Sequence, residues 1–194
     1  MSLITQLLVV LIAYALGCIA VGYYLVRWRT GEDLRAIGSG ATGGRNASRV
    51  LGMSGAIITG IADVLKGVAA MLIALWFKVE PWTIAFVMAA VLLGHIYPVQ
   101  LGFRGGKGLS AAFGAVLAYD YRIALTTAVI ALMLLALNRK RRSFLFLMGV
   151  ACAPFVAYFF GKRLEITTGI AVLVVIILYA HRENMRESWD LQSD

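Results

Sequence analysis

Two glycine-rich stretches, residues 38–49 and 102–108, carry the residue types best suited to chemistry in this sequence. They hold eight of the 20 glycines together with several Arg and Lys residues. Glycine lets backbone N–H groups converge on an anion, cationic side chains add charge, and a helix that begins after each stretch adds a positive dipole end. Either stretch alone is equally consistent with a tight turn, but the pair favours one phosphate-binding site. Its predicted residues are Gly38, Gly40, Arg45, Arg104, Gly105, Gly106, Lys107 and Gly108.

The stretches do not match the nucleotide-binding motifs that they superficially resemble. Residues 38–43 have the GxGxxG spacing, with Asp63 at the distance of a ribose ligand, but that motif requires a preceding strand and a βαβ unit. Here apolar segments lie on both sides. The second stretch fails as a P-loop because Leu101 and Gly108 stand where Gly and Ser or Thr are needed.

Further polar side chains lie within or at the ends of apolar segments. Asp63 and Lys66 are three residues apart, hence on one helix face, and either form a structural ion pair or place Lys66 toward an anionic substrate. His95 is either a hydrogen-bonded structural residue or part of a site. His181 and Asn184 follow the last apolar segment and are candidates to line the same site.

The elements that position these residues are expected to be membrane-spanning helices. Apolar residues make up 61% of the 194 positions, charged residues only 14%, and the mean hydropathy is +0.84. We therefore predict an all-α, single-domain polytopic membrane protein over residues 1–194, whose first segment is a retained helix rather than a signal peptide. Seven spans are expected, the fourth short or broken, at residues 3–26, 53–77, 82–99, 109–119, 123–137, 144–160 and 166–180.

The distribution of basic residues predicts the orientation. With the N-terminus outside and the C-terminus cytoplasmic, 13 of the 18 Lys and Arg residues lie in inner segments and four in outer ones. The basic run 139–142 then serves topology and contact with anionic lipid head groups.

Several other kinds of site are not indicated. We find no Ser-His-Asp order, no metal-ligand cluster and no aromatic residues interleaved with basic ones, so neither a metal nor nucleic acid is expected. Cys18 and Cys152 lie in apolar runs and are expected to be buried small residues rather than a disulfide.

Four collinear motifs closely resemble the bacterial acyl-phosphate:glycerol-3-phosphate acyltransferase family (PlsY). They are residues 38–49, Asp63-x-x-Lys66-Gly67, the run from Gly94-His95 to Gly105-Gly106-Lys107-Gly108, and residues 181–184. The resemblance implies a seven-helix enzyme of the bacterial inner membrane, with its active site on or near the cytoplasmic face. It would move a fatty acyl group from acyl phosphate to the 1-hydroxyl of glycerol 3-phosphate, giving lysophosphatidate and phosphate. It implies no cofactor and a monomer among membrane lipids.

The resemblance also implies roles for individual residues. Ser39, Arg49, His181 and Asn184 would be catalytic, Asn46 and Lys66 would join the phosphate-binding residues, and Asp63 and His95 would line the site. Because an acyl phosphate has a good leaving group, positioning and charge can supply most of the rate without a protein nucleophile. The proton of the attacking hydroxyl passes to a phosphate oxygen or to a histidine.

The chain departs from the family pattern at four positions, and two other functions compete with the resemblance. Ala41 replaces Asn, Arg45 replaces Thr, Glu187 replaces Arg and Ser193 replaces Glu, which points to an altered substrate or an inactive paralogue as alternatives. A transporter or binding protein for a phosphorylated solute would use the same cationic loops, but usually shows repeated halves. A metal-dependent head-group transferase is weakly supported, since the five Asp residues are scattered.

Overall fold

Every regular element that the structure describes is a helix, as predicted. The computed structural model describes residues 1–138 and 141–190, so Arg139, Lys140 and Ser193 lie outside it. The apolar runs form helices because a helix satisfies its backbone hydrogen bonds internally, which lipid demands. The α-helices are α1 (Leu3–Cys18), α2 (Val21–Thr30), α3 (Gly44–Trp76), α4 (Pro81–Ile96), α5 (Leu109–Tyr119), α6 (Tyr121–Leu137), α7 (Arg142–Ala151), α8 (Ala153–Phe159), α9 (Leu164–Ala180) and α10 (Arg182–Asp190), with 3₁₀ turns η1 (Leu34–Ala36) and η2 (Val99–Leu101).

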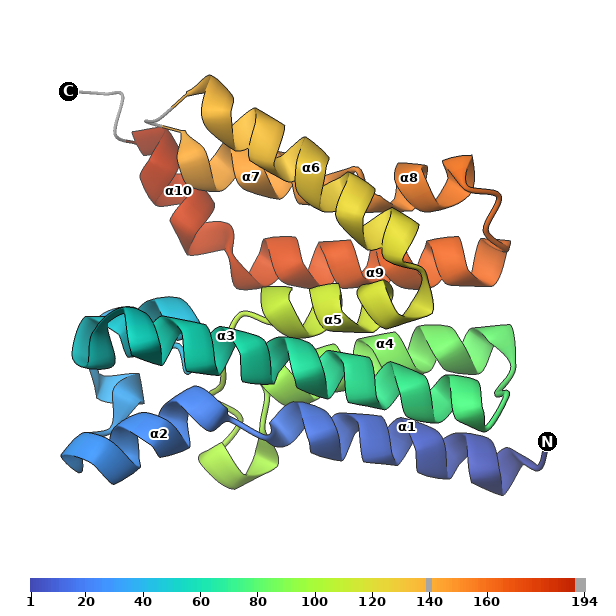
Figure 1. Ribbon diagram of the computed structural model, residues 1–194, viewed down its shortest axis with the longest axis horizontal. Coiled ribbons are helices and arrows are strands. Elements are labelled where there is room, and N and C mark those ends of the chain that lie inside the picture. Colours follow the sequence, from blue (N-terminus) through green and yellow to red (C-terminus); the bar gives the residue numbers. More distant parts are fainter. Residues whose placement is uncertain (139–140, 191–194) are drawn as a thin grey trace.

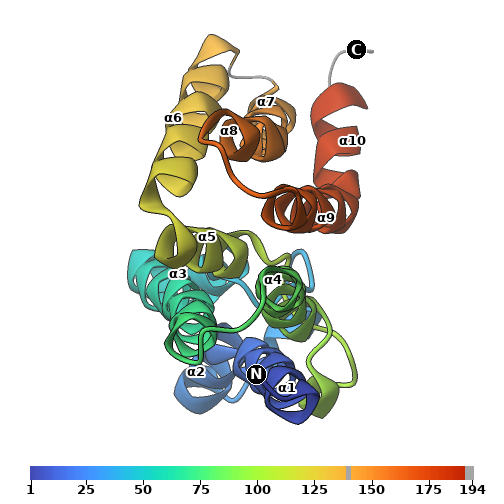
Figure 2. The same ribbon diagram turned by 90° about the vertical axis from the view of Figure 1, so that its right-hand side faces the viewer.

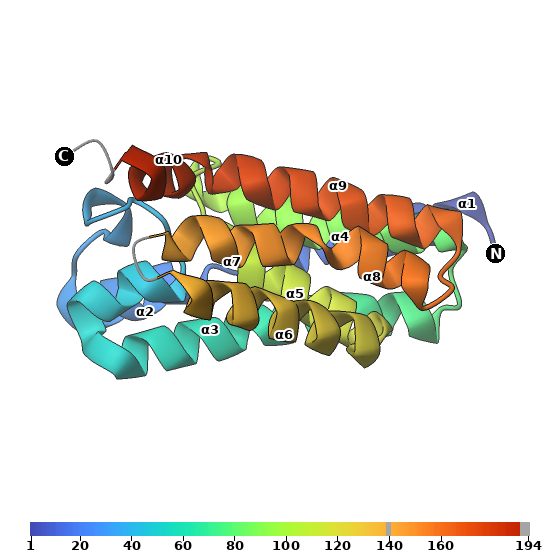
Figure 3. The ribbon, with the colours of Figure 1, turned by 90° about the horizontal axis from the view of Figure 1, so that it is seen from above.

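The helices form two groups with α5 between them. Figure 2 shows α1–α4 on one side of α5 and α6–α10 on the other. Figure 1 shows that the α3–α4, α5–α6 and α8–α9 turns share one end with the N-terminus, whereas α2, α10 and the beginning of α3 lie at the opposite end. The N-terminus and α10 are correspondingly far apart (Figure 3). Lys78, Arg122 and Lys162 are therefore at one end of the bundle, and the cationic residues of α10 and early α3 are at the other.

The described residues contain seven apolar helical segments, each of which overlaps one of the predicted segments in position. Four are long and apolar enough to cross a bilayer: Leu3–Thr30, Gly44–Trp76, Pro81–Leu101 and Arg142–Phe159. Three are shorter: Leu109–Tyr119, Tyr121–Leu137 and Leu164–Ala180. The fourth predicted span is short, as expected, but it is an uninterrupted helix.

The helix breaks occur in the first and sixth predicted spans instead. Between α1 and α2, the carbonyls of Cys18 and Ile19 accept hydrogen bonds from Gln100 Nε2 and, at 2.9 Å, from Lys66 Nζ. These distant side chains satisfy the carbonyls that the break frees. Between α7 and α8, Pro154 occupies the first turn of α8, where its missing N–H and its ring end the preceding helix.

Helix α3 begins nine residues earlier than the predicted span and bends at one glycine. Gly52 has φ 65° and ψ −157° within the helix, a conformation that a residue with a side chain rarely adopts. The turns before it fold back until Gly44 lies close to Ala56. Arg45 and Arg49 consequently lie on the first turns of a helix rather than in an irregular loop.

The helix pairs approach closely through small residues. A methyl group on Gly67 would lie 2.1 Å from the Ala111 carbonyl oxygen of α5, and one on Gly17 of α1 would lie 3.0 Å from Cα of Gly94 of α4. Such contacts are typical of helices that associate in lipid, where packing replaces the hydrophobic effect. Large apolar side chains cover much of the outer surface, including Trp76, which is 83% exposed at the end of α3. The free thiols differ in burial: Cys18 is buried, whereas Cys152 is half-buried.

Candidate active site

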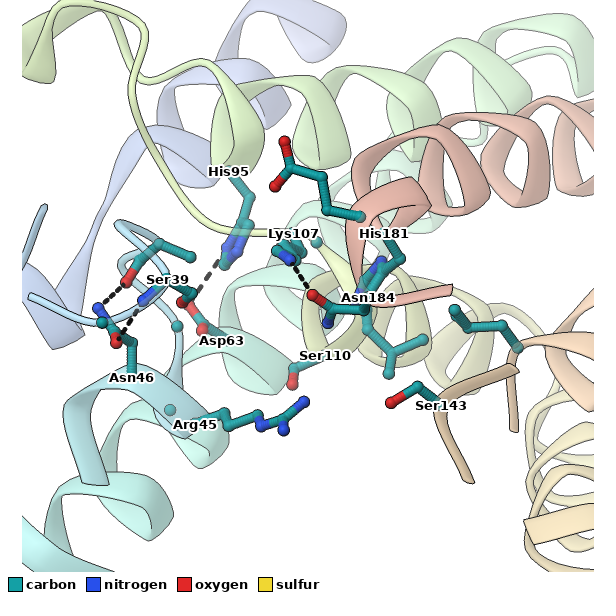
Figure 4. Close-up of a pocket in the computed structure, with 18 of the residues that line it drawn as sticks. Ser39, Arg45, Asn46, Asp63, His95, Lys107, Ser110, Ser143, His181 and Asn184 are labelled. Carbon is teal, nitrogen blue, oxygen red and sulfur yellow. Dashed lines mark hydrogen bonds and ion pairs between the residues drawn. The ribbon is translucent and has the colours of Figure 1, made fainter. Parts of the chain in front are cut away.

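A polar cavity of about 560 Å³ opens among the segments that the sequence singles out. Figure 4 shows side chains from early α3, the loop before α5, early α7 and the α9–α10 junction pointing toward one space. Eleven of the predicted site residues line it: Gly38, Ser39, Arg45, Asn46, Arg49, Asp63, His95, Lys107, Gly108, His181 and Asn184.

Asn46 holds the first loop in shape. Its side-chain nitrogen donates to the carbonyls of Leu34, Ile37 and Ala41 at 2.9–3.0 Å, and its Oδ1 accepts the Ser39 N–H at 3.3 Å. The side chain is 2% exposed and its two amide hydrogens are already committed to these three carbonyls. Asn46 therefore positions Ser39, and its amide hydrogens are directed to the loop carbonyls instead of to a phosphate.

Gly105 and Gly106 of the second loop are fixed by backbone hydrogen bonds. The N–H of Gly105 donates to the Ile96 carbonyl and that of Gly106 to the His95 carbonyl, both at 3.0 Å. The carbonyl of Gly105 accepts the Thr42 N–H at 3.2 Å, which joins the two loops. The N–H groups of these glycines are used within the fold, and neither residue lines the cavity, so the predicted N–H donation to phosphate is replaced by close packing.

Positive charge converges on the cavity from side chains and helix ends. Arg45, Arg49 and Lys107 line it, and α3 and α5 both begin at its wall, where the first-turn N–H groups have no partner within their own helix. Lys107 Nζ donates to Asn184 Oδ1 at 2.7 Å. This arrangement suits one or more phosphate groups.

His181 lies just beyond the end of α9 and faces the same space (Figure 4). Its Nδ1 is 2.9 Å from the Ile177 carbonyl oxygen, which can only accept, so Nδ1 carries the hydrogen and Nε2 is left as an acceptor when the ring is neutral. Burial lowers the pKa of His181 below its usual 6.5 more than the Ile177 hydrogen bond raises it, and nearby Lys107 and Arg45 lower it further. The ring is therefore neutral at pH 7.

Five predicted residues lie outside the cavity wall. Lys66 is buried behind it, with Nζ 2.9 Å from Asp63 Oδ1, so it does not reach the cavity as the prediction required. Arg104 is exposed and, like Gly40, is absent from the lining. Gly105 and Gly106 act through the backbone described above.

Several residues of the polar cavity wall were not predicted from the sequence. Ser110, Ser143 and Phe146 line it, as do Gly43, Gly44, Leu109, Leu147 and Glu183. Ser110 lies two residues after the second glycine stretch, which was a usable signal, whereas Ser143 and Phe146 belong to an apolar helix that carried none. Both described positions that depart from the family pattern near the loops, Ala41 and Arg45, also line the cavity. Among the described residues, no three His, Cys, Asp or Glu side chains gather as a metal site needs.

A second, apolar cavity of about 230 Å³ adjoins the polar one. Leu109, Ser110 and Phe146 line both. From this shared wall the apolar cavity runs between α5, α6, α7–α8 and α9 toward Val116 and Ala153. Six residues of helix separate Ser110 from Val116, which corresponds to about 9 Å of depth. The pair of cavities can hold a molecule with a charged head and an apolar tail.

Comparison with known proteins agrees with this geometry. The sequence model of the family described as "Glycerol-3-phosphate acyltransferase" matches residues 7–190. Glycerol-3-phosphate acyltransferase 1 of Desulfitobacterium hafniense is 42% identical over 186 residues, covering 94% of this chain and 90% of that protein. A glycerol-3-phosphate acyltransferase of Thermus thermophilus is 36% identical over 176 residues, covering 91% of this chain and 87% of that protein.

Two solved structures share the fold. The crystal structure of PlsY, an integral membrane glycerol 3-phosphate acyltransferase, in its glycerol 3-phosphate form has a TM-score of 0.86 at 33% identity, covering 94% of this chain and 90% of that one. Its lysophosphatidic acid form has a TM-score of 0.82 at 31% identity, with the same coverage. The chain thus belongs to the glycerol-3-phosphate acyltransferase family of integral membrane enzymes.

Proposed function

We propose that the protein transfers a fatty acyl group from acyl phosphate to the 1-hydroxyl of glycerol 3-phosphate, releasing lysophosphatidate and phosphate. The junction of the two cavities carries this proposal, because an acyl phosphate is charged at one end and apolar at the other. With its phosphate among Arg45, Arg49 and Lys107 and its chain in the apolar cavity, the bond to be broken lies at the shared wall. The forms in which the PlsY crystal structures are described, glycerol 3-phosphate and lysophosphatidic acid, correspond to the acceptor and the product.

The reaction needs no covalent intermediate with the protein. The glycerol oxygen attacks the carbonyl carbon of the mixed anhydride, the carbon–oxygen bond to phosphate breaks, and phosphate leaves with the electron pair. Cations and helix N-termini around the phosphates stabilise the charge that develops on the leaving group. Ser39 and Arg49, at the first loop, and Asn184, which holds Lys107, are the proposed positioning and charge-stabilising groups.

His181 is proposed to orient the attacking hydroxyl rather than to carry away its proton. A neutral ring with hydrogen on Nδ1 offers Nε2 as an acceptor for that hydroxyl. Forming an imidazolium beside Lys107 and Arg45 is unfavourable, because all three groups would be positive. The proton then passes to an oxygen of the departing phosphate, so the charges and atoms balance without a further base.

A soluble phosphorylated solute would occupy only the cationic cavity and would leave the apolar cavity without a ligand. A transporter or binding protein for such a solute would use the cationic cavity but not an apolar cavity joined to it. A paralogue with a changed acceptor remains the second candidate, because Arg45 places an additional cation in the cavity wall.

We further propose seven crossings of the bacterial inner membrane, an outside N-terminus, a cytoplasmic C-terminus and a site near the cytoplasmic face. The separation of basic residues between the two ends of the bundle supports this orientation (Figure 1). We also propose a monomer among membrane lipids as the functional unit. In a variant with Cys18 and Cys152 replaced by Ala, single cysteines at Lys78 and Lys162 should react with an impermeant maleimide on intact cells, whereas one at Arg142 should react only after permeabilisation. The reverse labelling pattern contradicts the orientation.

The decisive experiment measures phosphate release by purified protein in detergent, supplied with palmitoyl phosphate and glycerol 3-phosphate. Lysophosphatidate is followed by mass spectrometry, and palmitoyl-CoA replaces the donor in a parallel reaction. The proposal is supported if lysophosphatidate forms only when both substrates are present, and with palmitoyl phosphate but not with palmitoyl-CoA as the donor. Phosphate release without lysophosphatidate, in a folded sample, indicates a different acceptor, and turnover of palmitoyl-CoA overturns the assignment of the donor.

A further inference from the structure

A buried group of three titratable side chains lies at the inner wall of the polar cavity, where Asp63 and His95 line the cavity and Lys66 lies behind them. It consists of Asp63, Lys66 and His95, which are 3%, 6% and 5% exposed, and we call it the Asp63 network. Lys66 Nζ lies 2.9 Å from Asp63 Oδ1, and His95 Nδ1 lies 3.4 Å from the same oxygen. Burying charged side chains at this depth in a membrane protein is energetically costly, so we expect them to have a structural or functional role.

From His95 the network continues into the glycine loop. The His95 carbonyl accepts the Gly106 N–H at 3.0 Å, and the neighbouring Ile96 carbonyl accepts the Gly105 N–H at the same distance. A methyl group on Gly106 would lie 2.0 Å from His95 Nε2, so the ring rests directly against this residue and only glycine fits there. The ring and backbone of His95 therefore set the path of the chain immediately before Lys107.

On its other side the network is attached to the break in the first span. Lys66 Nζ also donates to the Ile19 carbonyl at 2.9 Å, between α1 and α2. Two of the three ammonium hydrogens thus serve Asp63 and Ile19, which fixes the lysine in place. Hydrogen bonds and contacts run in sequence from the α1–α2 break through Lys66, Asp63 and His95 to Gly106.

An ion pair that only holds helices together does not account for this arrangement. Asp63 and Lys66 are on the same helix, one turn apart, so their pairing joins no two elements. A buried pair is also weak support for stability, since apolar replacements are often neutral. The connections that leave the pair, to Ile19 and to His95, are the ones that join different parts of the fold.

We propose that Asp63 and Lys66 are positioning residues that fix the His95 ring, and that His95 in turn holds the Gly105–Gly106 backbone so that Lys107 meets the phosphate of glycerol 3-phosphate. The inference rests on the proposed function of Lys107. It assigns Lys66 to support of the loop and not to contact with a substrate.

The first test compares Asp63→Asn/Lys66→Met with the wild type. The double substitution removes both charges together and leaves no buried charge unpaired. Because the loop loses its support, the KM for glycerol 3-phosphate should rise at least about tenfold, the change expected when one hydrogen bond to a charged group is lost. The KM for palmitoyl phosphate and the melting temperature should change little. Thr59→Val, a buried substitution elsewhere on α3, is the matched control and should leave both KM values unchanged.

The second test examines the contact between His95 and Gly106 by a double-mutant cycle. Gly106→Ala should raise the KM for glycerol 3-phosphate in the wild type, because the methyl group displaces the ring. In His95→Ala, which has room for that methyl group, adding Gly106→Ala should raise the KM no further. His95→Asn, whose side-chain nitrogen can replace Nδ1, should restore much of the affinity lost in His95→Ala.

The outcomes separate this inference from the proposed function. Binding of glycerol 3-phosphate is also measured directly by calorimetry, without a donor, so failure of the wild type to use acyl phosphate bears on the function alone. A role limited to stability lowers the melting temperature and the yield of active enzyme with both KM values intact. That result, or additive effects of His95→Ala and Gly106→Ala, overturns the positioning role.

Discussion

Lys107 Nζ and Asn184 Oδ1 are 2.7 Å apart although 77 positions separate the two residues in the sequence. Gly108 alone separates Lys107 from the first residue of α5, and Asn184 belongs to the first turn of α10. The bond therefore joins the glycine loop to the C-terminal helix across the polar cavity (Figure 4). It holds the ammonium group where a phosphate is proposed to bind.

Removing either partner should weaken the binding of glycerol 3-phosphate. Lys107→Ala should raise its KM about 10- to 100-fold, because a charge-assisted contact to phosphate is lost, and Asn184→Ala should have a smaller effect of the same sign. Steady-state kinetics with saturating palmitoyl phosphate measures both. Arg104→Ala is the control, since Arg104 is exposed outside the cavity and its removal should leave the KM unchanged. An equal effect of Arg104→Ala would attribute the change to long-range charge.

Loss of Asn46 should loosen the first loop. Asn46→Ala leaves three loop carbonyls without their donor and should lower the free energy of unfolding by about 1–3 kcal/mol, with reduced kcat because Ser39 is displaced. Asn46→Asp should be worse, since a carboxylate repels the same carbonyls. Thermal melting in detergent together with initial rates tests this. Ser48→Ala, on the same helix turn and half-buried, loses only its bond to the Arg45 carbonyl and should behave as the wild type. An Asp variant as stable as the wild type would contradict the assignment.

The decrease in rate at low pH should reflect protonation of His181. A neutral ring is required, so kcat/KM should be constant above the pKa of the folded enzyme and fall as the pH drops through a midpoint below 6.5. Arg45→Thr removes a nearby cation and should move that midpoint up toward 6.5. A midpoint that does not move would separate this decrease from His181 and Arg45.

The lowered pKa of His181 also determines how the stability of the protein changes with pH. In the unfolded chain the ring takes up a proton near pH 6.5, before the folded protein does. Stability should therefore decrease as the pH falls from 6.5 through the lower pKa of the folded state, and His181 should contribute no pH dependence above 6.5. His181→Gln should flatten this part of the melting curve against pH.

Filling the far end of the apolar cavity should change the preferred donor. Ala153→Leu adds bulk opposite the shared wall and should lower the rate with palmitoyl phosphate severalfold while sparing an eight-carbon acyl phosphate. Val129→Leu, on the exposed side of α6, is the control of similar chemistry and should alter neither rate. Equal losses with both donors would show a general packing defect.

Much of the architecture follows from local sequence, and the exceptions have identifiable causes. Apolar runs predict the helical segments because length and hydrophobicity are local properties. The α7–α8 break has a visible local signal in Pro154, which our segment assignment did not use. The α1–α2 break has none, since it is maintained by Gln100 and Lys66 from other elements, and no property of residues 17–22 shows that those donors will be present.

The site was predictable in position more than in the role of each residue. Glycines and cations at fixed spacing indicate where an anion binds, and the structure brings Arg45, Arg49 and Lys107 together. Lys66 and Arg104 look equivalent to these cations in the sequence, but their side chains point elsewhere. Lys66 donates to the Ile19 carbonyl, and Arg104 is exposed on the surface of the protein. The apolar cavity was not predictable, because its wall comes from six helices that share no motif.

The shared wall at Leu109, Ser110 and Phe146 has a consequence for the two products. Inorganic phosphate dissolves in water, whereas lysophosphatidate keeps its chain among apolar neighbours, so the fragments depart into different phases. Once they separate, the chance that both return to one enzyme molecule is small. The boundary between the cavities therefore also separates the two products by their solubility, so neither has to pass through the space of the other to leave.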